Sequence, residues 1–288
     1  WQHPGSAKAK FIHLDNSYHG DTVGSVSVGG IDLFHKTYRS LLFDSYKVDS
    51  PYCYRCPKNK SYPLCNFECL DGLKEVLLKN HASICALIVE PLVQAAGGML
   101  VWPEGIYKEM RGLCNKYDVL LIADEVAVAM GRTGSMFASS SEGVSPDILC
   151  LAKGITAGYL PLAATLTTRK IFDAFLGGYE EKKTFFHGHT YTGNPLACAA
   201  AIASLDIFDK EKTLKKLKPK INFLKEELER FKQLEYVGDV RQKGFMVGIE
   251  LVKDKQTKEP YAWEEKIGAK VCAKVREHGV ILRPLGNV

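Results

Sequence analysis

The order of apolar runs and helical patterns along the chain restricts its fold more than any other feature. Five short apolar runs predict strands, and amphipathic stretches with helical spacing separate several of them. In the stretch 103–117, Pro103 suits a helix start, and Ile106, Met110 and Cys114 repeat at helical spacing. This alternation predicts an α/β domain with a mostly parallel sheet. The expected strands are 10–15, 86–92, 119–126, 148–152 and 162–168.

The pattern changes after Asn194. A long helical region runs to residue 231, and a hairpin-like pair of strands follows at 237–251. A helix at 263–278 and a final strand at 280–284 complete the chain. We therefore predict a large domain over residues 1–205 and a smaller α+β domain over residues 206–288.

Two of the expected strands end in residues that can carry chemistry. One apolar run ends in Asp124-Glu125 and another ends in Lys153-Gly154. The carboxyl ends of parallel strands open onto the crevice where ligands bind, so the acid and the amine can face one site. We expect Lys153 to lie in a desolvated setting, because Gly154 and Gly158 allow close backbone approach, and burial favours the neutral, nucleophilic amine. The structural alternative is a lysine that extends to solvent or pairs with Asp124.

An enzyme that forms a Schiff base needs such a pair. The lysine attacks a carbonyl, and the acid keeps a pyridine nitrogen protonated, which turns the cofactor ring into an electron sink. Asp124 and Lys153 are candidates for these two tasks. The alternative for Asp124 is an acid that caps a strand end or a nearby helix.

Two polar loops are candidates for the rest of the pocket. In the segment 17–22, Tyr18 can lie against an aromatic ring and Gly20 allows close backbone approach. A plain strand-to-helix turn, with Asp21 or Thr22 as the N-cap, is compatible with that role. The segment 187–195 is polar, contains glycine and opens an Ala-rich helix, which makes it a candidate anion site.

Several other functions lack support in the sequence. There is no Gly-Lys dipeptide of a Walker A loop, no Gly-x-Ser-x-Gly elbow and no His-Glu-x-x-His zinc site. The 38 Lys and Arg against 33 Asp and Glu form no concentrated basic stripe, so we expect no nucleic-acid partner. We find no apolar run long enough for a membrane span or a signal peptide, so we expect a cytoplasmic protein without membrane association.

Four of the nine cysteines lie close together, as Cys53-x-x-Cys56 and Cys65-x-x-x-Cys69. A zinc site is one interpretation of this cluster. The spacing departs from a paired zinc knuckle, and we favour a reduced loop cluster without a metal. We therefore assign no metal ligand.

Eight short blocks follow one another along most of the chain. They are Tyr18-His19-Gly20-Asp21-Thr22, Glu90-Pro91, Asp124-Glu125-Val126, Gly131-Arg132-Thr133-Gly134, Pro146-Asp147, Lys153-Gly154, Gly158-Tyr159-Leu160-Pro161 and Thr190-Tyr191-Thr192-Gly193-Asn194-Pro195. Together, in this order, they resemble the class III (ω-) aminotransferases. The resemblance implies PLP fold type I, pyridoxal 5'-phosphate (PLP) as the cofactor, transamination of small molecules and a homodimer.

The resemblance also implies roles for individual residues. Lys153 would bind the cofactor covalently and relay protons, and Asp124 would bind the pyridinium nitrogen. Tyr18 would stack on the cofactor ring and help to shape the substrate site. Val126 would pack against the other face of the ring, and Thr190 would bind the phosphate of the cofactor in the neighbouring subunit.

Three segments are most similar to one branch of the class, which converts 8-amino-7-oxononanoate to 7,8-diaminononanoate in biotin biosynthesis. They are 90–99, 185–190 and 282–286. The resemblance assigns Gly188 to the substrate site and Arg283 to the substrate carboxylate, a task suited to a bidentate guanidinium. An Arg before a Pro at a strand end also suits a structural ion pair. The ornithine and GABA enzymes typically have Gln where this chain has Val93. The amino donor, S-adenosylmethionine or lysine, stays open.

The chain departs from the family pattern in two ways. It has Val128-Ala129-Met130 where the family usually has Thr-Gly-Phe, which is expected to disturb the turn beside the cofactor. The family's N-terminal region, with a Gly-Ser phosphate-binding turn, has no counterpart here, and the segment after Arg283 stops early. The alternatives are therefore another ω-aminotransferase or a catalytically silent PLP-fold fragment.

Overall fold

The centre of the protein is a six-stranded sheet in the order β2-β1-β3-β6-β7-β8, seen in a computed structural model that describes residues 8–288. Neighbouring strands are parallel, except that β8 runs antiparallel to β7. The predicted α/β fold with a mostly parallel sheet is confirmed. The strands are β1 (Lys10–Leu14), β2 (Tyr46–Val48), β3 (Ile84–Val89), β6 (Leu120–Asp124), β7 (Ile148–Leu151) and β8 (Ala164–Thr167).

Helices cover the sheet because its central strands are apolar on both faces, as is typical of parallel sheets. Leu87 of β3 and Leu121 of β6 are fully buried. They belong to one core with residues of α3 (Asp71–Asn80) and α4 (Ile106–Lys116). In α4 the expected face is buried, with Ile106, Met110 and Cys114 inaccessible to solvent. The short helices α1 (Val23–Val26) and α2 (Asp32–His35) lie between β1 and β2.

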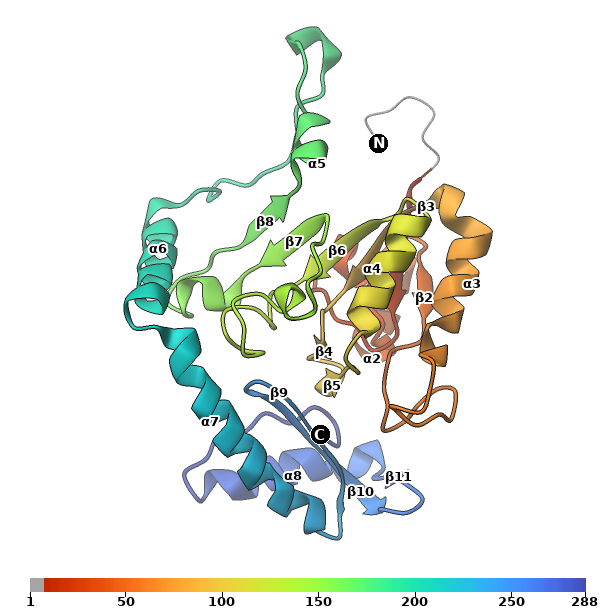
Figure 1. Ribbon diagram of the computed structural model, residues 1–288, viewed down its shortest axis with the longest axis vertical. Coiled ribbons are helices and arrows are strands. Elements are labelled where there is room, and N and C mark those ends of the chain that lie inside the picture. The colour runs from red at the N-terminus through yellow and green to blue at the C-terminus, as the bar shows by residue number, and fades with distance from the viewer. Residues whose placement is uncertain (1–7) are drawn as a thin grey trace.

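Beyond β8 the chain leaves the sheet. A segment that includes α5 (Arg169–Asp173) projects from the body of the molecule (Figure 1). The chain then returns through α6 (Pro195–Lys210) and α7 (Thr213–Leu228) to a second layer below the sheet (Figure 1). Asn194 caps α6, since its Oδ1 accepts from the backbone N–H of Leu196 and Ala197.

The second layer is a small antiparallel sheet in the order β11-β10-β9, with one helix beside it. Its elements are β9 (Val237–Lys243), β10 (Met246–Asp254), β11 (Glu259–Pro260) and α8 (Ile267–Arg276), and the short pair β4 (Val93–Gln94) and β5 (Leu100–Val101) lies between it and the main sheet (Figure 1). Gly244 in the β9–β10 turn has φ +63°, and a Cβ there would lie 2.4 Å from the Arg132 carbonyl oxygen. Glycine at this turn therefore allows the hairpin to approach the large layer closely.

The predictions for the C-terminal region hold for the hairpin and the helix but not for the final strand. The hairpin and the helix α8 formed where the pattern predicted them, whereas the expected final strand 280–284 is wrong. Among residues 8–288 this segment pairs with no strand, and it is the residue Asn287 beyond it whose carbonyl accepts from the Leu251 N–H of the small sheet, at 2.8 Å. The division at residue 205 stays a prediction, although residue 205 lies inside α6. Within residues 8–288, every helix is too short or too polar to cross a bilayer.

Candidate active site

The carboxyl ends of four neighbouring strands bring the predicted polar residues to one edge of the sheet. Asp124 ends β6, opposite Cys150 of β7, and Lys153 follows β7 by two residues. Glu90 follows β3, and the segment with Tyr18 follows β1. Since β1, β3, β6 and β7 are parallel, these segments leave the sheet on the same side.

Asp124 is a buried carboxylate, 8% exposed, whose two oxygens each have a protein partner. The backbone N–H of Val126 donates to Oδ1 at 3.1 Å. His19 Nδ1 lies 2.8 Å from Oδ2, and because a carboxylate only accepts, the hydrogen of this bond is on the histidine. Each oxygen of Asp124 keeps a lone pair for a further donor. His19 lies in one of the family blocks, but its contact with Asp124 was not predicted, because the two residues are 105 positions apart in the sequence.

Glu90 is a second buried acid at this edge, and its role was not predicted from the sequence. Its two carboxyl oxygens accept from the backbone N–H of Tyr18 at 3.1 Å and of Ala95 at 2.9 Å. Burial raises the pKa of Glu90 to about 7, against the opposing effect of His19. Glu90 therefore holds the backbone of the Tyr18 loop in place across 72 residues of sequence. The sequence feature that could have indicated this role is the position of Glu90, an acid directly after an apolar strand.

Tyr18 lies beside this acid pair. Its hydroxyl donates to Asp21 Oδ2 at 2.8 Å, and its ring meets Phe34 edge to face at 6.0 Å. Partial burial raises the pKa of Tyr18, as does Asp21, and the positive charge of Arg283 opposes this increase. The Arg283 guanidinium therefore lies within electrostatic range of the Tyr18 phenol. The helix after this loop has Thr22 as its N-cap, as one interpretation of the loop expected.

Lys153 lies where its strand predicts, but its setting differs from the expectation. It adopts a left-handed backbone with φ 45°, and its side chain is exposed rather than desolvated. The expected burial is wrong for this chain, and residues 157–161 after the lysine are exposed as well. Gly154 does allow close approach, since a Cβ there would lie 2.9 Å from the Cβ of Met130. Within residues 8–288 no hydrogen bond or ion pair joins Lys153 to Asp124.

The turn at Val128-Ala129-Met130 is ordered by hydrogen bonds, despite the departure from the family pattern. The Thr133 hydroxyl donates to the Val128 carbonyl at 3.0 Å, and the Met130 N–H donates to the Met136 carbonyl at 2.7 Å. Met130 takes a left-handed φ of 56°, which is an unfavourable backbone conformation for a non-glycine residue. The turn is therefore hydrogen-bonded and strained at Met130, and its effect on the cofactor stays a prediction.

The remaining predicted residues lie on exposed segments. Gly188 and Thr190 lie in the loop between the projecting segment and α6, and both are exposed. A Cβ at Gly188 would meet only the Thr192 hydroxyl, at 3.9 Å, so space does not require glycine there. Arg283 lies on the exposed tail after α8. The structure therefore clusters Tyr18, Asp124 and Val126 and leaves Gly188 and Thr190 open to solvent.

The sequence predicts no metal ligand, and this stays a prediction. As the side chains of residues 8–288 stand, no three of their His, Cys, Asp and Glu groups are arranged to hold a metal ion.

The fold and this edge of the sheet define a class of protein. A model of the aminotransferase class III family matches residues 2–288, so the chain belongs to that family, as its sequence blocks indicate. The chain is 56% identical to the adenosylmethionine-8-amino-7-oxononanoate aminotransferase of Geobacter sulfurreducens, over 100% of this chain and 64% of that protein. It is 47% identical to the protein of that name from Methanocaldococcus jannaschii, over 98% of this chain and 63% of the relative.

Solved structures agree with this relationship. The crystal structure of the Methanocaldococcus jannaschii aminotransferase superposes with a TM-score of 0.91 at 46% identity and covers 98% of this chain and 62% of that one. A PLP-bound amine transaminase from an uncultivated Pseudomonas species has the same TM-score at 40% identity, over 98% of this chain and 64% of its own. The chain thus spans less than two thirds of these relatives. The predicted class III aminotransferase fold is confirmed.

Proposed function

We propose that this chain carries the catalytic residues of a cytoplasmic PLP-dependent aminotransferase that converts 8-amino-7-oxononanoate to 7,8-diaminononanoate in biotin biosynthesis. The observation that carries the proposal is the buried carboxylate of Asp124, held by His19 at the strand edge that also presents Lys153. The named relatives support the choice of substrate. The free thiols of the nine cysteines suit a reducing compartment.

The residues present fit PLP on one structural criterion. A pyridinium nitrogen needs an ionised carboxylate with a free lone pair, and Asp124 has one on each oxygen beyond its bonds to His19 and Val126. When bound, PLP supplies an electron sink for the electron pair left at the amino-bearing carbon when its proton departs. Asp124 would hold the nitrogen, Tyr18 and Val126 would contact the ring, and Lys153 would hold the aldehyde carbon.

The protein's own groups then divide the work. The negative charge of Asp124 keeps a proton on a bound ring nitrogen, and the His19 bond fixes the direction of that carboxylate. The Lys153 amine accepts a proton from one carbon and returns it to another as the amino group changes place. Arg283 would bind the carboxylate at the far end of the substrate, and its electrostatic effect on the Tyr18 phenol supports a contact near the predicted ring site.

A homodimer is part of the proposal. The projecting segment and the start of α6 expose large apolar side chains, among them Tyr179 at 99%, Phe186 at 81% and Leu196 at 71%. An apolar surface on an extended segment is typical of a protein interface. Thr190, exposed on the same segment, is then available to the phosphate of the cofactor in the neighbouring subunit.

Covalent labelling tests the proposal. We expect borohydride reduction of the PLP-loaded protein, followed by peptide mass spectrometry, to place a pyridoxyl group on Lys153, because it is the lysine at the Asp124 edge. The substitution Lys153→Ala removes the label. Lys170→Ala, which changes another exposed lysine 17 positions along, keeps it. Absence of any pyridoxyl lysine would instead identify a catalytically silent member of the family.

A further inference from the structure

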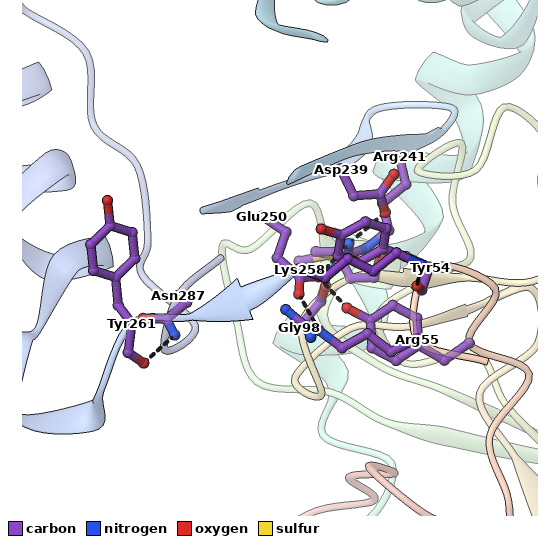
Figure 2. A network of polar contacts seen from close by, with 11 residues as sticks. Tyr54, Arg55, Gly98, Asp239, Arg241, Glu250, Lys258, Tyr261 and Asn287 are labelled. Carbon is purple, nitrogen blue, oxygen red and sulfur yellow. Dashed lines mark hydrogen bonds and ion pairs between the residues drawn. The ribbon is translucent and has the colours of Figure 1, made fainter. Parts of the chain in front are cut away.

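Arg241 of β9 is a buried cation at the place where the second layer meets the large layer. It is 9% exposed, and its guanidinium donates in two directions. Within the small sheet, Nη1 donates to Asp239 Oδ2 and to Glu250 Oε2, each at 2.8 Å. In the β4–β5 turn, the Met99 carbonyl accepts from Nε at 2.8 Å and the Gly98 carbonyl accepts from Nη2 at 2.5 Å. Figure 2 shows Asp239, Glu250 and Gly98 close to Arg241. One side chain therefore joins the small sheet to that turn.

The loop 49–67, between β2 and the turn at Glu68–Leu70, completes this charge cluster. Arg55 Nε donates to Glu250 Oε1 at 2.8 Å, and the Tyr52 hydroxyl donates to Glu250 Oε2. Glu250 is 5% exposed, so its charge depends on these donors rather than on water. A guanidinium holds its donors in a rigid plane, so the bonds of Arg241 fix the direction as well as the distance of the contact between the layers.

The β4–β5 turn continues to the edge of the main sheet that carries the candidate active site. Within the turn, the Met99 N–H donates to the Ala95 carbonyl at 2.9 Å. The Ala95 N–H donates to Glu90 Oε2 at 2.9 Å, and the other carboxyl oxygen of Glu90 accepts from the Tyr18 N–H at 3.1 Å. Arg241 is therefore connected to the backbone of the Tyr18 loop by one turn and one buried acid.

The second layer also carries the chain segment with Arg283. The Leu251 N–H of β10 donates to the Asn287 carbonyl at 2.8 Å, and Asn287 Nδ2 donates to the Tyr261 carbonyl at 2.9 Å. Figure 2 shows the contact between Asn287 and Tyr261. These bonds hold the tail after α8, and Arg283 with it, to the layer that Arg241 anchors.

The same tail packs closely against two neighbours. A Cβ at Gly268 of α8 would lie 2.2 Å from the Gly286 carbonyl oxygen, so the tail lies directly on this helix. A Cβ at Gly98 would lie 3.5 Å from Val288 Cγ2, so the tail also reaches the β4–β5 turn. The position of the tail is therefore set by α8 and by the turn that Arg241 binds.

We propose that Arg241 is a positioning residue that sets the distance from Arg283 to the Asp124 edge, and with it the length of the carboxylate substrate that the site accepts. This inference rests on the proposed function. Asp124 and Lys153 belong to the main sheet, whereas Arg283 follows α8 of the second layer. A substrate that carries its carboxylate far from its reacting carbonyl must span the two layers. The contact that fixes the separation of the layers therefore selects the length of the substrate.

A substrate series tests this role. It consists of 8-amino-7-oxononanoate and two homologues, one methylene shorter and one methylene longer between carboxylate and ketone. We expect the unaltered PLP-loaded chain to prefer the first by about tenfold or more in kcat/KM, the usual scale for one methylene. The Arg241→Lys ammonium keeps a charge beside Glu250 but does not reach both carbonyls of the turn, so the preference should fall below about threefold. The change should appear in KM, since Asp124 and Lys153 still hold the reacting end.

Two further variants complete the series. Arg230→Lys changes an exposed arginine shortly before β9 and should keep the preference. Asn287→Ala covers the case in which Arg241→Lys fails to fold, because it loosens the tail by removing the bond to Tyr261 and should also reduce the preference. An unchanged preference in folded Arg241→Lys or, failing that, in Asn287→Ala would overturn the proposal. An equal fall of kcat with all three substrates would overturn it as well.

Hydrogen exchange of the full chain without substrate separates this inference from the proposed function. Arg241→Lys should speed exchange of the Tyr18 and Ala95 amides by about fivefold or more, the scale of one lost hydrogen bond, and leave the amides of α4 unchanged. Unchanged exchange at Tyr18 would overturn the link from Arg241 to the site, whatever the chain catalyses. The expected exchange in a chain that turns over none of the three substrates would instead overturn the proposed function, and with it the role of Arg241 in substrate length.

Discussion

Asp124 is expected to act through its charge, because an amide in its place keeps the shape of the side chain and one of its two accepted hydrogen bonds. In Asp124→Asn, the amide oxygen still accepts one bond, but a neutral group does not hold a pyridinium proton. We expect transamination to fall by about 100-fold or more, the usual scale for a preorganised electrostatic contact. Steady-state rates, with circular dichroism as the check on folding, measure this effect. Near-normal turnover would remove Asp124 from the proposed role.

Arg283 is the residue that we propose to select the substrate. A long keto-amino acid carries its carboxylate far from the reacting carbonyl, and burying that charge requires a cationic partner. We expect Arg283→Ala to weaken binding of 8-amino-7-oxononanoate by a few kcal/mol, seen in the Michaelis constant, and Arg283→Lys to recover only part of it. Arg276→Ala, on the exposed side of α8, is the matched control. Equal Michaelis constants for Arg283→Ala and the unaltered chain would favour another ω-aminotransferase substrate.

At the scale of elements, β10 is held to the loop and to β9 by Glu250. Burial alone would raise the pKa of Glu250, but Tyr52, Arg55 and Arg241 outweigh burial and lower it. An acid with a lowered pKa stabilises the fold above its unfolded value, and this contribution is lost as the pH falls below about 4.5. Glu250→Gln leaves two guanidinium groups short of a partner, so we expect a loss of about 3 kcal/mol at pH 7.

Urea unfolding at pH 7 and at pH 4 measures this effect. The difference between Glu250→Gln and the unaltered chain should be smaller at pH 4 than at pH 7, because pH 4 is below the ordinary pKa of a glutamate, where the stabilisation from the lowered pKa of Glu250 begins to be lost. Glu264→Gln, an exposed glutamate of the same layer, should change neither value by more than about 0.5 kcal/mol. A constant difference at both pH values would show that Glu250 acts by packing rather than by charge.

At the scale of the whole molecule, the projecting segment exposes Tyr179 at 99% and Phe186 at 81%, and the proposed dimer would bury this apolar surface. We expect Phe186→Asp to shift the protein from dimer to monomer, because a charge would be buried in an apolar interface. Leu78→Asp, which changes an exposed apolar residue of α3, should leave the dimer intact. Sedimentation velocity measures both variants. A monomeric parent protein, or a dimeric Phe186→Asp variant, would contradict this interface.

The sequence by itself determined five of the six strands of the main sheet, all but β2, and the positions of the chemical residues at their ends. Strand and helix periodicity are local, so the runs that became β1, β3, β6, β7 and β8 were visible without any contact information. A residue at the end of such a strand necessarily reaches the carboxyl edge of a parallel sheet, which placed Asp124 and Lys153 there. The family blocks predicted the class for the same reason, since they lie on these strand ends and turns.

Only the tertiary structure decided which groups meet. The hydrogen bonds of His19 to Asp124 and of Glu90 to the Tyr18 backbone join residues 105 and 72 positions apart in the sequence. No local sequence pattern encodes contacts between such distant positions. The burial of a residue likewise depends on which other parts of the chain pack over it, so the strand pattern did not predict the exposure of Lys153. The segment 280–284 has the composition of a strand but pairs with no strand of residues 8–288, and pairing rather than propensity forms a strand.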